Sequence, residues 1–332
     1  MTKPFSLPKP TFILSIHRSG STLLQSLLDG HNELIVDVGD SHFFHFLPKL
    51  VKLKNLSKIR FFKDVIISKY LNECSLYYQE YLSHISLPKF QESFDKYLTK
   101  SNVSCNDLFD AYIYAMAMTS NQKKEAKYFV SKILKNEYSK EFILNSWPDV
   151  KIIYLFRDPR DIYASFKVRD EKNNRSVTEV NALAFSWEKS IQTFKYYSHE
   201  LTPTNCLMIR YEDLVMEQSK TMSKIISFLN IDYDKTLLNP TKGNGSVKWL
   251  GNAASGLKKN NVDKIDRKKY LSILTREEIN EIESLLMLEM NYLGYKITSK
   301  PSDQFIYPFS RMKNFLRKIK HDITDKRLAK AL

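Results

Sequence analysis

The alternation of short apolar segments with longer helical patterns most constrains how this chain of 332 residues can fold. The short segments are apolar almost throughout and rich in β-branched or aromatic residues, which is typical of strands buried on both faces of a parallel sheet. They are residues 11–16, 128–133, 151–156 and 206–210, with 34–37 as a weaker fifth. The helical patterns between them cover residues 21–29, 138–147, 160–168, 177–199 and 212–229. This order predicts an α/β fold, a three-layer sandwich whose central parallel sheet has helices on both faces.

A long aromatic-rich, mainly helical segment at residues 41–124 interrupts the alternation. Its aromatic residues include Tyr70, Tyr77, Tyr78, Tyr81 and Phe90. We interpret this segment as a helical cap insertion over the site and as the source of acceptor specificity. The predicted organisation is therefore one domain at residues 1–300, containing the cap insertion, followed by a basic helical tail at 301–332. A polar, Gly- and Asn-rich stretch at 240–264 predicts a loop that returns over the carboxyl edge of the sheet.

The net charge indicates which ligands the protein favours, and the cysteines indicate the cellular compartment. Lys and Arg number 51 against 37 Asp and Glu, and this net charge of +14 favours anionic ligands such as nucleotides, acidic glycans, nucleic acid or an anionic membrane. The three cysteines Cys74, Cys105 and Cys206 have no metal-ligand spacing, so we expect neither a disulfide framework nor a zinc site. A reducing, cytoplasmic location suits them. We expect no membrane span, because every apolar run is much shorter than about 20 residues. We expect no secretion signal, because the polar residues 17–20 follow the short apolar run at 11–16 directly.

The tail combines a basic surface with an apolar stripe at helical spacing. The apolar residues are Phe309, Met312, Leu316, Ile319 and Ile323. Such a helix either packs its stripe on its own domain, which is the arrangement we expect, or makes a peripheral contact with an anionic membrane.

The junction between the first strand and the first helix predicts a phosphate-binding loop. Residues 17–22 read HRSGST, and the candidate ligands are Arg18, Ser19, Gly20, Ser21 and Thr22. Such a turn aims backbone N–H groups and the positive end of a helix at one point, and glycine allows a phosphate to approach the backbone closely. The lysine of a Walker loop is missing, which argues against hydrolysis of nucleoside triphosphates. The alternative is an ordinary strand–turn–helix junction with an N-capping serine.

A second motif follows a later strand. Residues 152–165 read IIYLFRDPRDIYAS, so Arg157 leaves the strand end, Pro159 falls in the first helical turn and Ser165 lies about two turns into the helix. A guanidinium and a hydroxyl would then converge on one phosphate. The alternative is a surface network of Arg and Asp at a helix start. Because ligands of parallel sheets sit beyond the carboxyl ends of the strands, we expect Arg18, Lys132 and Arg157 at one edge.

Together the two motifs resemble the sulfotransferase superfamily, whose 5'-phosphosulfate loop reads Arg/Lys-Ser-Gly-Ser/Thr-Thr and whose 3'-phosphate signature pairs a strand-end Arg with a Ser eight residues later. Residues 27–31, LLDGH, resemble its carbohydrate and tyrosylprotein branch, although Asn32 replaces the usual proline. The resemblance implies the P-loop NTPase-like sulfotransferase fold. It also implies transfer of a sulfuryl group from 3'-phosphoadenosine 5'-phosphosulfate (PAPS) to a hydroxyl acceptor, a carbohydrate or glycolipid, with adenosine 3',5'-bisphosphate as product and no metal.

The same resemblance implies catalytic residues. Lys132 stands where the family commonly has a lysine that contacts the transferring group and would stabilise charge in the transition state, with Lys135 as a rival. Residues 39–44, GDSHFF, resemble a Glu-x-His-Phe-Phe stretch of the family. We favour Asp40, in the place of the glutamate, as the general base; the alternative is His42, since histidine ordinarily has a pKa of about 6.5.

The remaining candidates are residues that would bind the nucleotide. Tyr211 lies in a segment that resembles the family's Tyr-Glu-Asp, which implies a place beside the adenine; the alternative is an ordinary packing residue. Lys248, Gly251 and Asn252 resemble a Gly-Asn element near the nucleotide in the carbohydrate-type branch. Two other function classes are alternatives to a sulfotransferase. A P-loop kinase or NTPase would need Mg²⁺ and a Walker lysine, and a nucleic-acid-binding protein fits the net charge. The basic residues are dispersed and form no recognised module, so we expect no nucleic acid partner.

Overall fold

The computed structural model describes residues 6–68, 86–119, 126–134, 139–245, 247–249 and 268–299. Several sequence-based predictions fall outside these residues. They concern the tail at 301–332, the four tyrosines Tyr70, Tyr77, Tyr78 and Tyr81, and the site candidates Lys135, Gly251 and Asn252.

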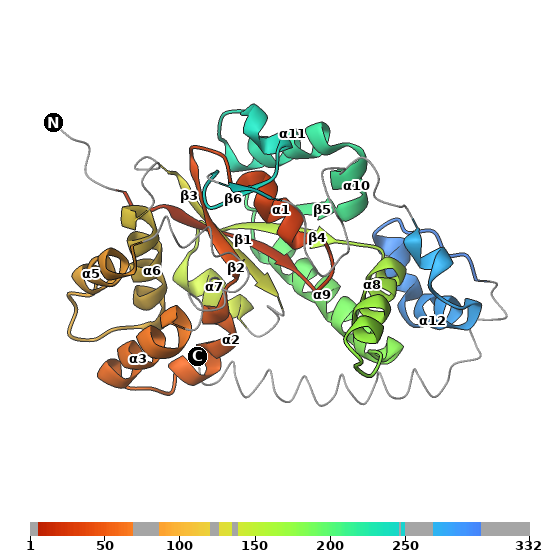
Figure 1. Ribbon diagram of the computed structural model, residues 1–332, viewed down its shortest axis with the longest axis horizontal. Helices are drawn as coiled ribbons and strands as arrows, with labels where there is room; N and C mark the ends of the chain where they lie inside the picture. Colours follow the sequence, from red (N-terminus) through yellow and green to blue (C-terminus); the bar gives the residue numbers. More distant parts are fainter. Residues whose placement is uncertain are drawn as a thin grey trace.

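A five-stranded parallel sheet forms the centre of the molecule, with the strand order β2-β3-β1-β4-β5 (Figure 1). The strands are β1 (Lys9–Ser15), β2 (Leu34–Asp40), β3 (Tyr128–Leu134), β4 (Lys151–Phe156) and β5 (Cys206–Arg210). All five predicted strands are therefore present, and the weak one extends to Asp40. The predicted α/β fold is confirmed.

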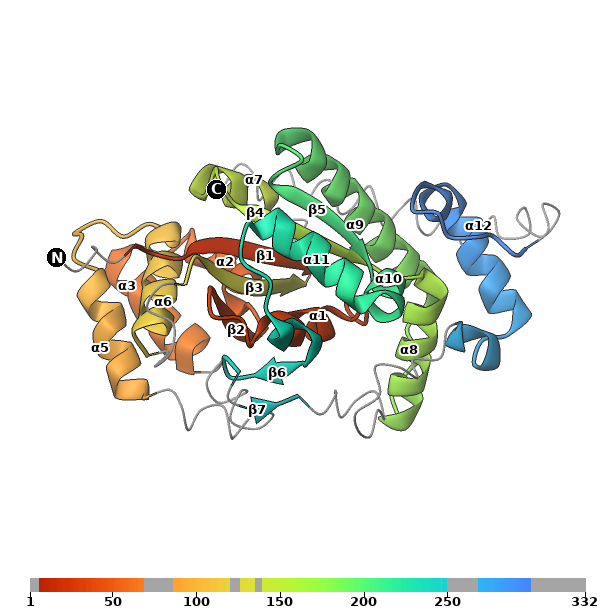
Figure 2. The ribbon, with the colours of Figure 1, turned by 90° about the horizontal axis from the view of Figure 1, so that it is seen from above.

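Two hydrophobic cores cover the two faces of the sheet. Alternate residues of a strand point to opposite faces, so Phe12 and Leu14 of β1 belong to one core and Ile13 to the other. The Ile13 core includes side chains of α1 (Ser21–Leu28), α10 (Tyr211–Met216) and α11 (Gln218–Leu229). The Phe12 core includes α2 (His42–Leu50), α6 (Cys105–Thr119), α7 (Lys140–Ser146), α8 (Pro159–Lys172) and α9 (Val180–Glu200). Figure 2 shows α11 and α9 on either side of the sheet.

Every predicted helix differs from its observed bounds by at least one residue, and two of them differ most. The pattern at 212–229 is divided at Glu217, whose backbone (φ −129°, ψ 50°) leaves the helical region between α10 and α11. The helix predicted at 160–168 continues to Lys172, because Asp170 on its last turn is buried and bonded to Thr178. Pro159 lies in the first turn as predicted, and Asp158 caps the helix by accepting from the backbone N–H of Arg160.

The segment predicted as a cap contributes side chains to the Phe12 core. Its described helices are α2, α3 (Asn55–Phe61), the π-helix η1 (Phe62–Ile67), α5 (Leu87–Tyr97) and α6. Phe109 of α6 packs against the sheet residues Phe12 and Phe129, with ring centroids 5.9 and 6.1 Å apart. Phe90 is buried beside Tyr112. The apolar face of α6 thus covers the sheet, which the cap interpretation did not foresee.

The described part of the stretch predicted as a returning loop contains a hairpin, β6 (Thr241–Lys242) and β7 (Val247–Lys248), after η2 (Lys235–Leu238). The carboxylate of Asp29 accepts hydrogen bonds from Thr241, Asn244 and Gly245 at 2.8–3.0 Å. The side-chain oxygen of Asn244 accepts from the backbone N–H of Val36, on the outer strand β2. The hairpin therefore covers an edge of the sheet.

The last described elements are η5 (Lys269–Ser272) and α12 (Arg276–Tyr292), and α12 packs against α9. A capping box at Thr275 and Glu278 begins α12. Within the described ranges, no helix is both long enough and apolar enough to cross a bilayer.

Candidate functional site

The loop between β1 and α1 adopts two left-handed backbone conformations. The φ angle is 69° at Arg18 and 90° at Gly20. Gly20 is the N-cap of α1, and its carbonyl accepts hydrogen bonds from the N–H groups of Leu23 and Leu24. No side chain caps this helix, so the alternative prediction of an N-capping serine is wrong. Uncapped N–H groups at a helix start leave donors for an anionic ligand.

Tyr211 explains why the loop needs glycine at position 20. A Cβ atom at Gly20 would lie 2.2 Å from Cδ2 and 2.3 Å from Cε2 of the tyrosine ring. Tyr211 follows β5 directly, begins α10 and is 8 % exposed. The carboxyl end of β5 thus places a buried aromatic ring against the loop that follows β1.

The Arg157 side chain joins the same group. It follows β4, donates from Nη1 to the backbone oxygen of Arg18 at 3.1 Å, and lies over the Tyr211 ring with Cζ 4.5 Å from the centroid. Arg18 in turn donates from Nε to Oγ of Ser165 on α8 at 2.8 Å. The two predicted phosphate motifs therefore meet, although Arg18 and Arg157 are 139 residues apart in the sequence.

The electrostatics of this cluster favour an anion. Burial lowers the pKa of Arg18, and so do the neighbouring guanidiniums of Arg169 and Arg157, while Asp170 opposes them. The Nε atom of Arg157 is buried and has no hydrogen-bond partner within the described part of the chain. A guanidinium N–H that is buried in this way suits a phosphate oxygen as acceptor.

Lys132 lies at the centre of a second group of predicted residues. It is 5 % exposed, and its Nζ lies 2.9 Å from Oγ1 of Thr22 and 2.8 Å from Oδ1 of Asp40. Lys132 and Asp40 are opposite each other on β3 and β2. The backbone of Lys132 also accepts a hydrogen bond from Ser41 at 2.8 Å. One ammonium group therefore connects the loop helix α1 with the end of β2.

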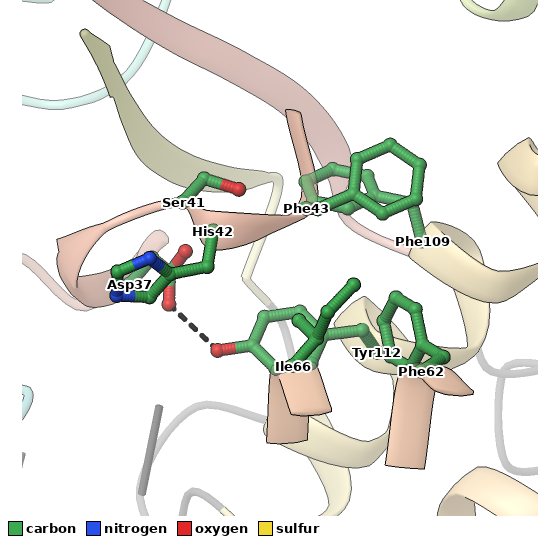
Figure 3. A pocket seen from close by; sticks show the side chains of 8 residues that line it. All are labelled: Asp37, Ser41, His42, Phe43, Phe62, Ile66, Phe109 and Tyr112. Atoms are coloured by element: carbon green, nitrogen blue, oxygen red, sulfur yellow. Dashed lines mark hydrogen bonds between the residues drawn. The ribbon is translucent and has the colours of Figure 1, made fainter. Parts of the chain in front are cut away.

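His42 lies beside an aromatic-walled pocket (Figure 3). Asp37, Ser41 and His42 form its polar side, and the apolar wall consists of Phe43, Phe62, Ile66, Phe109 and Tyr112. The Tyr112 hydroxyl points to the polar side and donates to Oδ1 of Asp37 at 2.8 Å, and Ser131 donates to Oδ2 at 2.7 Å. The pocket lies between β2, α2, η1 and α6, and its lining residue Ser41 follows Asp40 in the sequence.

Gln25 is a site residue that the sequence analysis missed. Its Nε2 donates to the backbone oxygens of Asp37 at 2.6 Å and Gly39 at 3.1 Å. The pairing of β2 with β3 shifts register between Val36 and Asp40, and Gln25 supports the chain there. A buried polar residue in the leucine-rich sequence of α1 was the available signal.

The other predicted site residues lie at different places relative to the arginine cluster of Arg18 and Arg157. Ser19 and Ser21 lie in the loop and are buried. Lys248 is exposed in β7, and within the described part of the chain no hydrogen bond or ion pair joins it to the arginine cluster. Among the residues that the structure describes, no group of three His, Cys, Asp or Glu side chains could hold a metal ion. That the reaction needs no metal stays a prediction.

The known proteins that this chain is similar to are sulfotransferases. A family model described as "Sulfotransferase family" matches residues 10–235, more than half of the chain. The solved sulfotransferase domain from the curacin biosynthetic pathway is 22 % identical, with a TM-score of 0.59 over 88 % of this chain and 99 % of that one. The sulfotransferase domain from the Synechococcus PCC 7002 olefin synthase is 21 % identical, with a TM-score of 0.45 over 91 % and 94 % of the two chains. A sulfotransferase from Alicyclobacillus acidocaldarius is 12 % identical, with a TM-score of 0.44 over 88 % and 97 %. A search of curated protein sequences found no match.

Proposed function

The chain belongs to the sulfotransferase family, and we propose that it transfers a sulfuryl group from PAPS to a hydroxyl group of its acceptor. The observation that carries this proposal is the convergence of the two phosphate motifs. Arg157 donates to the backbone of Arg18, and Arg18 donates to Ser165, so both motifs lie within the reach of one nucleotide.

In the proposed donor complex the two motifs hold different phosphates. The loop at residues 18–22 binds the 5'-phosphosulfate through its N–H groups and the Thr22 hydroxyl. Arg157 and Ser165 bind the 3'-phosphate, and the buried Nε of Arg157 becomes a donor to it. Tyr211, which lies between Gly20 and Arg157, supports the adenine side of the site.

The proposed transfer is an in-line displacement. The acceptor oxygen forms a bond to sulfur while the bond from sulfur to the 5'-phosphate oxygen breaks, and the electron pair of that bond stays with adenosine 3',5'-bisphosphate. Lys132 stabilises the charge that develops on the bridging oxygen, because Thr22 holds its ammonium beside the loop. Asp40 takes the proton of the acceptor hydroxyl. We favour Asp40 over His42 because Asp40 contacts Lys132, whereas His42 lies on the side of the aromatic pocket.

The proposed acceptor is a hydroxyl group of a carbohydrate or glycolipid, which is supported by the resemblance of residues 27–31 to the carbohydrate branch. The pocket at His42 has an apolar wall of Phe43, Phe62, Ile66 and Phe109. Its cavity of about 10 Å³ has room for one water molecule, so the choice between the two acceptors does not rest on it. A cytoplasmic location remains part of the proposal, and it is supported by Cys105 and Cys206, which are both free thiols.

Calorimetric titration with adenosine 3',5'-bisphosphate tests the proposal directly. The wild-type protein should bind it, and Arg157→Ala should lose at least about tenfold in affinity, the effect of one charge-assisted hydrogen bond. Arg60→Ala is the matched control, since this arginine is exposed on α3. Magnesium-dependent turnover of ATP, or no binding of the bisphosphate by the wild type, would count against the proposal.

A further inference from the structure

The end of β2 leaves the regular ladder of the sheet just before Asp40. From Val36 to Asp40, β2 advances four residues while its partner β3 advances two, so residues 37–39 form a bulge. Gly39 in this bulge has a left-handed φ of 70°. A bulge changes the direction in which the following side chain points, and it leaves backbone groups without partners in the ladder. The position of Asp40 beside Lys132 therefore depends on what holds the β2 bulge.

Gln25 of α1 holds the backbone of the β2 bulge. Its Nε2 donates to the backbone oxygens of Asp37 at 2.6 Å and Gly39 at 3.1 Å. Both partners are acceptors, so both N–H groups of the amide are used. The Gln25 residue is 5 % exposed, and a buried carbonyl that loses its donor is destabilising. One side chain thus fixes the first and the last carbonyl group of the bulge.

The side chain of Asp37 holds the bulge from the other face of the sheet. Its Oδ1 accepts from the Tyr112 hydroxyl at 2.8 Å and its Oδ2 from Ser131 at 2.7 Å (Figure 3). Tyr112 belongs to the Phe12 core, whereas the α1 side chains that pack on the sheet belong to the Ile13 core. The bulge is therefore restrained from both faces before any substrate binds, which is what precise placement of a reacting group requires.

One face of α1 sets both members of the Lys132–Asp40 pair. Thr22 and Gln25 are three residues apart on this helix, so they are neighbours on one face. Thr22 accepts from the Lys132 ammonium at 2.9 Å, and the same ammonium lies 2.8 Å from Oδ1 of Asp40. The helix thus places the ammonium directly through Thr22, and it places the carboxylate through Gln25 and the β2 bulge.

We propose that Gln25 is a positioning residue for sulfuryl transfer, which holds the β2 bulge so that the Asp40 carboxylate reaches the acceptor hydroxyl. This assignment rests on the proposed function, because that function makes Asp40 the base. Gln25 acts through Asp40 and is not itself a catalytic residue. A misplacement of about 1 Å at a reacting group lowers a rate by about 10²-fold. Loss of the Gln25 amide should therefore lower kcat and leave binding of the nucleotide unchanged.

Replacing Gln25 by methionine tests the role of its amide, because methionine has a similar length and no N–H donor. With saturating PAPS and the best acceptor from a series of sugars and glycolipids, Gln25→Met should lower kcat by about 10–10²-fold. Its affinity for adenosine 3',5'-bisphosphate in calorimetry should stay within about twofold of wild type. Gln218→Met is the matched control, because Gln218 of α11 also donates to a backbone oxygen, that of Leu238, away from β2. The control should leave both quantities within about twofold.

A double-mutant cycle separates positioning from general destabilisation. When Asp40→Asn is already present, Gln25→Met should lower kcat by less than about a further twofold, because no carboxylate is left to be placed. Losses that multiply would overturn the positioning role, and so would weaker binding of the bisphosphate that parallels the loss of kcat. Both results would leave the proposed function in place. The proposed function itself would fail in a different way, through a wild-type protein that does not bind the bisphosphate.

Discussion

The Nζ atom of Lys132 lies 2.8 Å from Oδ1 of Asp40. The same ammonium donates to Thr22 at 2.9 Å, so it links the end of β2 to the first turn of α1. His42 is only two residues beyond Asp40 but lies on the side of the aromatic pocket, with Asp37 and Tyr112. The two candidate bases therefore have different surroundings, and substitutions at them should have different kinetic effects.

Replacing Asp40 should affect the chemical step. Asp40→Asn keeps the shape of the side chain but removes the proposed proton acceptor, so kcat should fall by about 10²–10⁴-fold. Binding of adenosine 3',5'-bisphosphate should change little. His42→Gln should instead raise KM for the acceptor and leave kcat within a few fold. Steady-state rates with saturating PAPS and a series of sugar and glycolipid acceptors would measure both parameters. The reverse pattern, with kcat lost only in the His42 variant, would make His42 the base.

Much of the sheet, and the residues that meet in the candidate site, could be predicted because the signals are local. Buried parallel strands are short apolar runs, and a strand end followed by a glycine turn or an Arg is visible in the sequence. Because the carboxyl ends of parallel strands share one edge of the sheet, Arg18, Lys132 and Arg157 could be predicted to lie at that edge. The predicted membership of the sulfotransferase family is confirmed, whereas its carbohydrate branch stays a proposal.

The rest depended on contacts between distant segments. Nothing in the local sequence of α6 shows that Phe109 packs on Phe12 and Phe129, so the segment was interpreted only as a cap. The hairpin at residues 241–248 depends on Asp29, more than 200 residues earlier. Periodicity gives the buried face of a helix but leaves open which partner covers it.

The contact between Gly20 and Tyr211 predicts a stability difference between two glycines. Both Gly20 and Gly39 have positive φ angles, 90° and 70°, so alanine at either position costs about 1 kcal/mol in backbone strain. A Cβ at Gly39 meets nothing within 4 Å, whereas one at Gly20 meets the Tyr211 ring at 2.2 Å. Gly20→Ala should therefore lower the free energy of unfolding by about 1–3 kcal/mol more than Gly39→Ala. Urea denaturation followed by tryptophan fluorescence measures the difference, and equal losses would mean that the ring moves aside freely.

A buried ion pair connects α12 to the start of α8, the helix that carries Ser165. Glu283 is fully buried, accepts a hydrogen bond from Arg160, and also accepts from the backbone N–H groups of Thr298 at 2.9 Å and Ser299 at 2.6 Å. Burial alone would raise the pKa of Glu283, but the hydrogen bonds from Ser299 and Thr298 lower it. The carboxylate form is therefore the one that the fold stabilises.

The lowered pKa of Glu283 fixes the sign of its pH dependence. An unfolded glutamate titrates at about 4.3, so its stabilising contribution is complete above that pH and is lost as the pH falls through the lower pKa of the folded state. Glu283→Gln should lower the free energy of unfolding at pH 7 by about 2 kcal/mol, the value of a hydrogen bond to a charged group. Urea denaturation from pH 7 to pH 3 should show the gap between wild type and variant shrinking below about pH 4. Glu171→Gln, at an exposed position on α8, should show no such gap. A gap that stays constant down to pH 3 would mean that the charge of Glu283 does not stabilise the fold.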